Sequence, residues 1–329
     1  MASLPTEESI VRIVELPVLR SREVPAALRW ELQRVLPFSV DDAVFDYAEL
    51  PAHLAGLGRP PGPGAPLPGG QETLPRRRYA VSGALEEAVQ RRLAQLRELG
   101  IRPAVLEPEW VTLWRLAVEL AGGEAALCGV VDVGAAGTRL VLVDAAGVPV
   151  VFHRSPVGGR ALDGELAAAL GTTPEEAEKI KLTELASDLG PLSSSAALGE
   201  LAGGLARALR RAQREVPAGA VEIWAVGGGA LWPALRATLA EALGLELRVP
   251  GSSGIPARSP LAALDPRWAV AGALARWQLA RGAGRGDGQR HRWIGRRDRR
   301  PSAPAAGAQP HTAVTARGTI TPGERSPSA

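Results

Sequence analysis

Asp132 follows an apolar run and precedes a short segment of glycine and alanine. The stretch VVDVGAAGTRLVLVD continues with Gly134, Gly137 and Thr138, and its pattern predicts two strands joined by a tight hairpin. Small residues let backbone amides approach a phosphate, while a carboxylate beside them would hold a hydrated Mg²⁺ rather than the phosphate itself. An aspartate that caps a solvent-exposed hairpin has the same pattern, so both interpretations remain open.

A second cluster of small residues, Gly227, Gly228, Gly229 and Ala230, lies between an expected strand and a helix that Gly244 ends. Three consecutive glycines expose backbone on which an adenosine or its phosphates could lie, near a helix N-terminus whose amide dipoles favour anions. A turn that needs one positive φ angle accounts for one glycine more easily than for three. The pattern therefore favours a nucleotide contact at this turn.

The segment GTTPEEAEKIK, between these clusters, predicts a helix that begins at Thr173, Pro174 and Glu176. Glu178 and Lys181 are three residues apart and share one face of that helix. A carboxylate and an ammonium placed in this way could take the ribose hydroxyls and the base edge of a nucleotide. As a surface pair they would contribute only about 0.2–0.5 kcal/mol.

Hydrophobic periodicity places these motifs among alternating strands and helices. Helices are expected after Ser21, which would cap the first of them, around 85–96 and over 109–120. A loop rich in proline and glycine covers 57–78. The expected strands are 10–16, 43–50, 79–81, 101–106, 127–131, 138–143 and 148–154.

The composition narrows the class of protein. The sequence has no charge-free apolar run of about 18 residues and no apolar signal-peptide region, so we expect a cytoplasmic protein. Cys128 is the single cysteine, and its apolar neighbours favour a core position. The net charge of +3 arises in 281–329, which holds ten arginines and three acidic residues. This tail is predicted to be disordered, either as a solvated extension or as a contact for nucleic acid or anionic lipid.

The order of the motifs resembles the second lobe of the actin-like ATPase superfamily. The landmarks are the aspartate hairpin, FHRSPVGGRAL, the AEKIK helix and the GGGA turn. Within that superfamily the chain is most similar to the PilM family of type IV pilus assembly proteins. The similarity rests on an N-terminal segment with an LP strand, RWE, PF and DY, on LRELGIRPAVLEPEWVTLWRLA, and on WAVAGALARW, and it covers about residues 4–278. FtsA is a more distant relative that shares a small inserted subdomain.

The resemblance implies an α/β fold of the actin-like ATPase (ribonuclease H-like) class, N-terminally truncated, with a small SHS2-like αβ insert and a disordered tail. The implied divisions are 1–19 as a remnant of the first lobe, 20–106 as the insert, 107–126 as a helix returning to the first lobe, 127–280 as the second lobe and 281–329 as the tail.

The resemblance also implies a function, that of a cytoplasmic nucleotide-binding scaffold of the pilus machine or a related secretion or competence machine. It would bind the cytoplasmic tail of a PilN-like inner-membrane protein and so lie peripheral to that membrane. ATP or ADP with Mg²⁺ would be the cofactor, with the metal held by Asp132 through water. The implied nucleotide contacts are Asp132, Gly134, Gly137 and Thr138 for phosphate, Glu178 and Lys181 for ribose, and Gly227, Gly228, Gly229 and Ala230 for adenosine.

For the partner, we expect a surface on the helix over 24–36 and the strand over 43–50. Arg29, Trp30 and Arg34 offer apolar and basic side chains there, beside a possible open sheet edge to which a peptide could add. Trp30 is equally compatible with a position in the core.

The sequence departs from the family pattern in two places. Asp163 stands where the family has a threonine, as a possible helix cap. An actin-like core also needs a first lobe with its own Asp-Gly hairpin, roughly 50 residues that do not precede the strand over 10–16. Either translation starts upstream of Met1, which we favour, or half of the phosphate clamp is missing. For the chain as it stands we expect weak or no ATP binding and at most weak ATPase activity.

Two further classes of protein are considered. A small-molecule kinase of the same superfamily would need a substrate-facing carboxylate in the cleft. A nucleic-acid-binding protein would rest on the arginine-rich tail alone.

Overall fold

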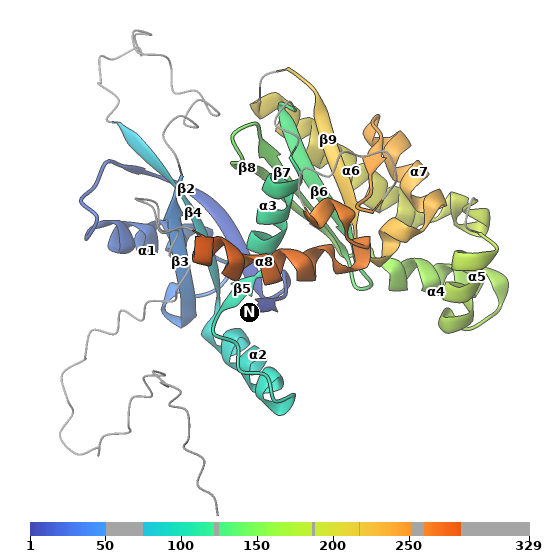
Figure 1. Ribbon diagram of the computed structural model, residues 1–329, viewed down its shortest axis with the longest axis horizontal. Helices are drawn as coiled ribbons and strands as arrows, with labels where there is room; N and C mark the ends of the chain where they lie inside the picture. Colours follow the sequence, from blue (N-terminus) through green and yellow to red (C-terminus); the bar gives the residue numbers. More distant parts are fainter. Residues whose placement is uncertain (51–74, 122–124, 186–187, 217, 252–259, 284–329) are drawn as a thin grey trace, which may run out of the picture. The chain divides into compact units, whose positions relative to one another are not determined.

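The computed structural model describes residues 1–50, 75–121, 125–185, 188–216, 218–251 and 260–283, with side chains described up to 276. Most of the expected loop over 57–78 and the tail from residue 284 onward lie outside the described residues. The described chain alternates strands and helices (Figure 1).

A five-stranded mixed sheet of order β10-β9-β6-β7-β8 forms the larger layer. The β6–β7 and β7–β8 pairs are antiparallel, whereas β9 runs parallel to both β6 and β10. Successive residues of β6 alternate between two cores, as expected for a strand buried on both faces. The bounds are β6 Leu127–Val133, β7 Thr138–Asp144, β8 Pro149–Ser155, β9 Val221–Val226 and β10 Leu247–Arg248.

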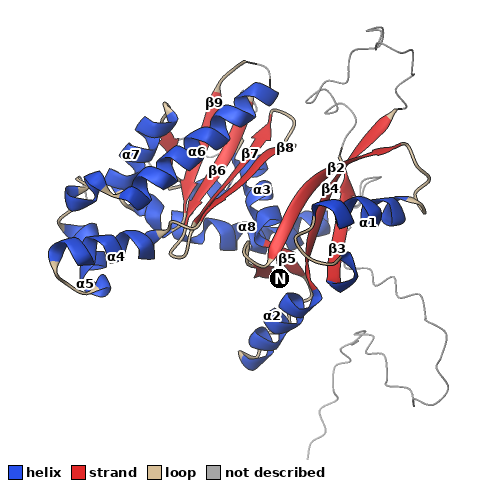
Figure 2. Cartoon of the chain, turned by 180° about the vertical axis from the view of Figure 1, so that it is seen from behind, coloured by secondary structure: helices blue, strands red, loops and turns tan. Residues whose placement is uncertain are grey.

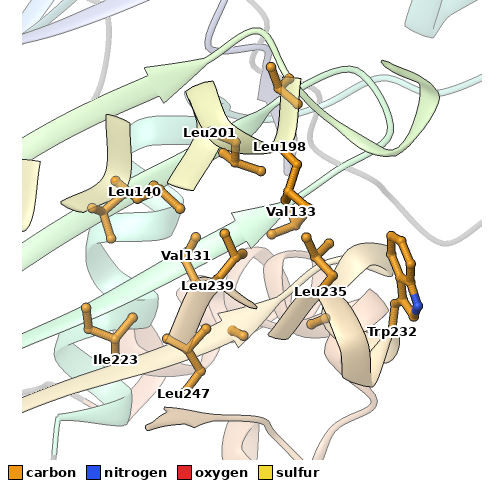
Figure 3. Packing of buried hydrophobic residues seen from close by; sticks show 14 of the residues in the cluster. Val131, Val133, Leu140, Leu198, Leu201, Ile223, Trp232, Leu235, Leu239 and Leu247 are labelled. Carbon is orange, nitrogen blue, oxygen red and sulfur yellow. The ribbon is translucent and has the colours of Figure 1, made fainter. Parts of the chain in front are cut away.

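Helices cover both faces of this sheet (Figures 1 and 2). One face carries α4 Gly159–Leu170, α5 Pro174–Thr183, α6 Ala196–Glu215 and α7 Pro233–Leu243. Leucines of α6 and α7 pack there on β6, β7 and β9 (Figure 3). The other face carries α3 Glu109–Leu120 and α8 Ala269–Ala283, with the short helices η5 Pro260–Ala263 and η6 Pro266–Trp268.

A second, antiparallel sheet has the order β2-β4-β3, so β2 and β3 are its outer strands. Helix α1 packs on it through Leu28 and Leu32, which meet Val14, Tyr79 and Val81. Two short strands, β1 before this sheet in sequence and β5 after it, pair with each other in parallel. The bounds are β1 Ala2–Leu4, β2 Ser9–Pro17, α1 Val24–Val35, β3 Ala43–Glu49, β4 Arg76–Leu85, α2 Glu86–Glu98 and β5 Leu106–Pro108.

Several expected boundaries need correction. Ser21 does not cap α1, because the cap position is Glu23, whose side chain makes no capping hydrogen bond to the helix. The strand expected at 101–106 is only Leu106–Pro108, since Pro103 lacks the N–H that a ladder needs. The small sheet begins at Ser9, inside the range assigned to the first lobe, because β2 pairs with β4 along its full length.

None of the described helices combines the length and the apolar content that a bilayer-spanning segment requires.

Candidate functional site

The tip of the β6–β7 hairpin packs backbone to backbone on the start of α4. The N–H of Gly134 donates to the carbonyl of Gly137 (3.0 Å), and the N–H groups of Gly159 and Arg160 donate to the carbonyls of Gly134 and Ala135 (both 2.9 Å). A Cβ on Gly158 would lie 2.4 Å from the nitrogen of Gly137. Glycine is therefore required for the hairpin to approach the helix so closely.

Thr138 joins the hairpin to the segment before α4. Its side chain is fully buried, and its hydroxyl donates to the carbonyl of Val157 (2.8 Å). The hydroxyl is thus engaged in joining β7 to the segment before α4, while Ala135 and Ala136 at the hairpin tip are exposed. A ligand at the tip would meet these two exposed alanines first.

The turn of Gly227 to Ala230 lies directly against the end of β6. A Cβ on Gly227 would be 2.4 Å from Oδ1 of Asp132, and one on Gly229 would be 2.4 Å from a methyl of Val133. Gly227 has φ 84° and ψ 175°, a conformation that glycine alone adopts readily. Its N–H donates to the carbonyl of Pro266 (2.9 Å). The two glycine clusters, about 90 residues apart in sequence, therefore meet at Asp132.

Asp132 is buried, with 5% of its surface exposed. Nη1 of Arg139 donates to its Oδ2 over 2.9 Å. Burial raises the pKa of Asp132, and the charge and hydrogen bond of Arg139 oppose that rise. Because Oδ2 is engaged by Arg139 and Oδ1 faces the Gly227 turn, the carboxylate as arranged does not fit a hydrated Mg²⁺.

Sequence reasoning missed Arg139. Its Nε donates to Oγ1 of Thr6 (3.0 Å) and lies 3.3 Å from Oε2 of Glu109. The signal was present, because a four-residue turn in the predicted hairpin makes Asp132 and Arg139 cross-strand partners, and opposite charges there attract. Among the described residues, no group of three or more His, Cys, Asp or Glu side chains could hold a metal ion.

Glu178 and Lys181 have different surroundings. Glu178 is exposed, whereas Lys181 is buried, with 7% exposed. The ammonium of Lys181 pairs with Asp163 of α4 and lies 5.8 Å from the centre of the Trp232 ring. Because the N-cap of α4 is Gly158 and Asp163 lies inside the helix, Asp163 is not a helix cap.

The side chains expected to meet a partner lie on α1. Trp30 is 59% exposed, so it is not a core residue. The guanidinium of Arg34 lies over its ring at 5.5 Å, and Arg29 forms an ion pair with Asp41. The outer strands β2 and β3 offer main-chain groups to an added strand.

The five-stranded mixed sheet with helices on both faces, together with the similarity below, defines the fold class as an actin-like α/β fold. A solved chain of the "PilM-PilN type IV pilus biogenesis complex" is similar, with a TM-score of 0.65 and 24% identity over 84% of this chain and 78% of that chain. Ethanolamine utilization protein EutJ from Carboxydothermus hydrogenoformans has a TM-score of 0.40, with 19% identity over 55% of this chain and 59% of its own. MreB5 of Spiroplasma citri bound to ADP has a TM-score of 0.44, with 14% identity over 60% of this chain and 66% of its own. No protein-family model matches the sequence, and no curated protein is significantly similar to it.

Proposed function

We propose that the protein is a nucleotide-binding scaffold of a type IV pilus or related assembly machine, and that it binds the cytoplasmic tail of a PilN-like inner-membrane protein. The observation that carries the proposal is the structural likeness to a chain of the PilM–PilN complex over most of both chains. The protein would then act in the cytoplasm, at the inner membrane through its partners.

Nucleotide binding is supported by three backbone segments that meet in one place: the hairpin tip, the first turn of α4 and the Gly227 turn. We assign the hairpin tip, which the first turn of α4 supports, to the phosphates of ATP or ADP, and Gly227 to Ala230 to the adenosine. Glu178 is placed on the exposed face of α5 and is our candidate for the ribose. Lys181 and Thr138 support the site from within, because both are buried and engaged.

The carboxylates of the described chain fit a protein that binds a nucleotide better than a kinase that phosphorylates a substrate. A kinase needs a carboxylate free to face its substrate. Each of the four buried carboxylates instead has an oxygen engaged inside the protein: Asp132 by Arg139, Glu107 by Arg115 and Thr112, Asp163 by Lys181, and Asp144 by the N–H groups of Ala146 and Val148. The second oxygens of Glu107 and Asp144 are buried and have no hydrogen-bond partner among the described residues.

For the partner, we propose the surface of α1 that carries Arg29, Trp30 and Arg34, together with an outer strand of the small sheet. A peptide added to a strand edge gains affinity from main-chain hydrogen bonds and selectivity from side chains such as an exposed tryptophan. The pair of Trp30 and Arg34 presents an apolar and a cationic group together, which suits a tail with apolar and acidic residues.

The test is a pull-down of the full-length gene product by the N-terminal tail of the inner-membrane protein encoded beside it, with and without ATP. Retention by the tail, and none by a scrambled tail, supports the scaffold. If a PilM protein is retained by its own partner's tail under the same conditions and this protein is not, the proposal fails. Calorimetric titration with ATP and ADP tests the nucleotide part separately.

A further inference from the structure

Arg139 is surrounded by groups from three other parts of the chain. Its side chain is 12% exposed. The guanidinium meets Asp132 of β6, Glu109 of α3 and the hydroxyl of Thr6, and its Nη2 lies 3.8 Å from Glu7. Arginine stays protonated at any physiological pH and binds carboxylates through a rigid set of donors. The cluster therefore contains a permanent cation that the fold itself provides.

The hairpin register fixes where this cation lies. Asp132 and Arg139 are direct partners in the β6–β7 ladder, so the backbone brings the two charges together whenever the hairpin forms. A buried carboxylate needs a counter-charge and hydrogen bonds to remain ionised. Arg139 supplies both from inside the protein, and no ligand is required for this purpose.

Other groups of the protein occupy the space around both carboxylate oxygens of Asp132. Oδ2 accepts from Arg139, and Oδ1 lies where a Cβ on Gly227 would be within 2.4 Å. Only 7% of the side chain of Asp132 is exposed. Mg²⁺ keeps several waters in an octahedral shell of radius about 2.1 Å, and a carboxylate that binds it through water must face that shell.

We propose that Arg139 takes the place of the divalent cation at this site, so that the protein binds nucleoside di- and triphosphates without requiring Mg²⁺. The inference rests on the proposed nucleotide binding. Arg139 is then a positioning residue that holds Asp132 against the Gly227 turn, and the phosphates meet the exposed hairpin tip at Ala135 and Ala136.

The first experiment compares ADP titrations in EDTA and in excess Mg²⁺. We expect wild-type dissociation constants that agree within about twofold. We expect Mg²⁺ to strengthen ADP binding to Arg139→Met, where Asp132 has lost its cation. A strengthening of about tenfold or more in the wild type, abolished by Asp132→Asn, overturns the inference while leaving nucleotide binding intact.

The second experiment needs no nucleotide and uses Mn²⁺ as a probe, followed by water-proton relaxation. We expect no Asp132-dependent Mn²⁺ site in the wild type. Arg139→Met should gain a site that the double variant Arg139→Met/Asp132→Asn loses. The double variant also leaves no unpaired charge in the Arg139–Asp132 pair, and thermal unfolding checks that each variant is folded.

The outcomes of these experiments distinguish a failure of the role proposed for Arg139 from a failure of the proposed nucleotide binding. If ADP binds neither the wild type nor Arg139→Met under any condition, nucleotide binding is wrong, and the Mn²⁺ result alone decides the role of Arg139. An Asp132-dependent Mn²⁺ site in the wild type, or none in a folded Arg139→Met, contradicts that role.

Discussion

Lys181 of α5 and Asp163 of α4 form a buried ion pair beside the indole ring of Trp232. The side chains are 9% and 10% exposed, and Trp232 donates its Nε1–H to the carbonyl of Leu185 (2.7 Å). The pair therefore joins two helices to the segment that follows the Gly227 turn. It positions one wall of the candidate nucleotide site from inside the protein.

Breaking this ion pair should be costly. Lys181→Met leaves Asp163 buried without its counter-charge, so we expect a loss of about 3–5 kcal/mol in the free energy of unfolding. Lys181→Met/Asp163→Asn, which removes both charges, should lose less than Lys181→Met alone. Denaturant unfolding measures both. Lys179→Met on the exposed side of α5 is the matched control, and a loss as large as that of Lys181→Met would show that the pair is not special.

Two substitutions in the Gly227 turn distinguish an effect on stability from an effect on nucleotide binding. Gly227→Ala should cost about 1–3 kcal/mol from its backbone conformation alone, with further strain because the new Cβ meets Asp132 and Val133. Gly228→Ala should leave stability unchanged, since among the described residues no atom beyond its chain neighbours lies within 4 Å of a Cβ there.

If adenosine lies on this turn, Gly228→Ala should nevertheless weaken ADP binding, because the added methyl occupies the exposed face. Calorimetry with both variants checks this. Wild-type ADP affinity in Gly228→Ala would remove the turn from the nucleotide site.

Acidification should destabilise the protein through His153. Burial lowers the pKa of this imidazole below 6.5, and Arg207 lowers it further. Its Nε2 is buried, with no hydrogen-bond partner among the described residues, and a Cβ on Gly204 of α6 would lie 3.1 Å from it. The unfolded chain then binds the proton more tightly, so stability is present above the unfolded pKa and is lost as the pH falls below it.

Denaturant unfolding at about pH 7.5 and about pH 5.5 measures that loss. His153→Gln should lose less stability between the two pH values than the wild type does. Equal losses in the two proteins would show that His153 contributes nothing to the pH dependence.

Trp30 should matter for the partner and not for the fold. Because 59% of it is exposed, Trp30→Ala should change the free energy of unfolding by no more than about 0.5 kcal/mol. The affinity for the partner's tail should fall about tenfold or more if Trp30 anchors it. Leu99→Ala, at an apolar residue that is 74% exposed near the end of α2, is the control. Equal tail affinity in both variants would place the binding surface elsewhere.

Local pattern predicted the elements that carry their own signal. Helix α3 has the predicted bounds, and the hairpin of β6 and β7 has the predicted turn, because apolar alternation and glycine placement are encoded in adjacent residues. The pair of Asp132 and Arg139 followed from that register but was not inferred. The partner of Lys181 could not be read in this way, since Asp163 belongs to another helix and helix packing decides the contact. The contact between the Gly227 turn and Asp132 likewise depends on the order of strands in the sheet.

The most direct test of the scaffold is an equilibrium titration of the full-length gene product with a fluorescent peptide. The peptide is the N-terminal cytoplasmic tail of the inner-membrane protein encoded beside it. We predict saturable binding at one site per chain, weakened by Trp30→Ala and absent for a scrambled peptide. The absence of saturable binding, with or without ATP, in a preparation that is folded and active in ADP binding would contradict the account.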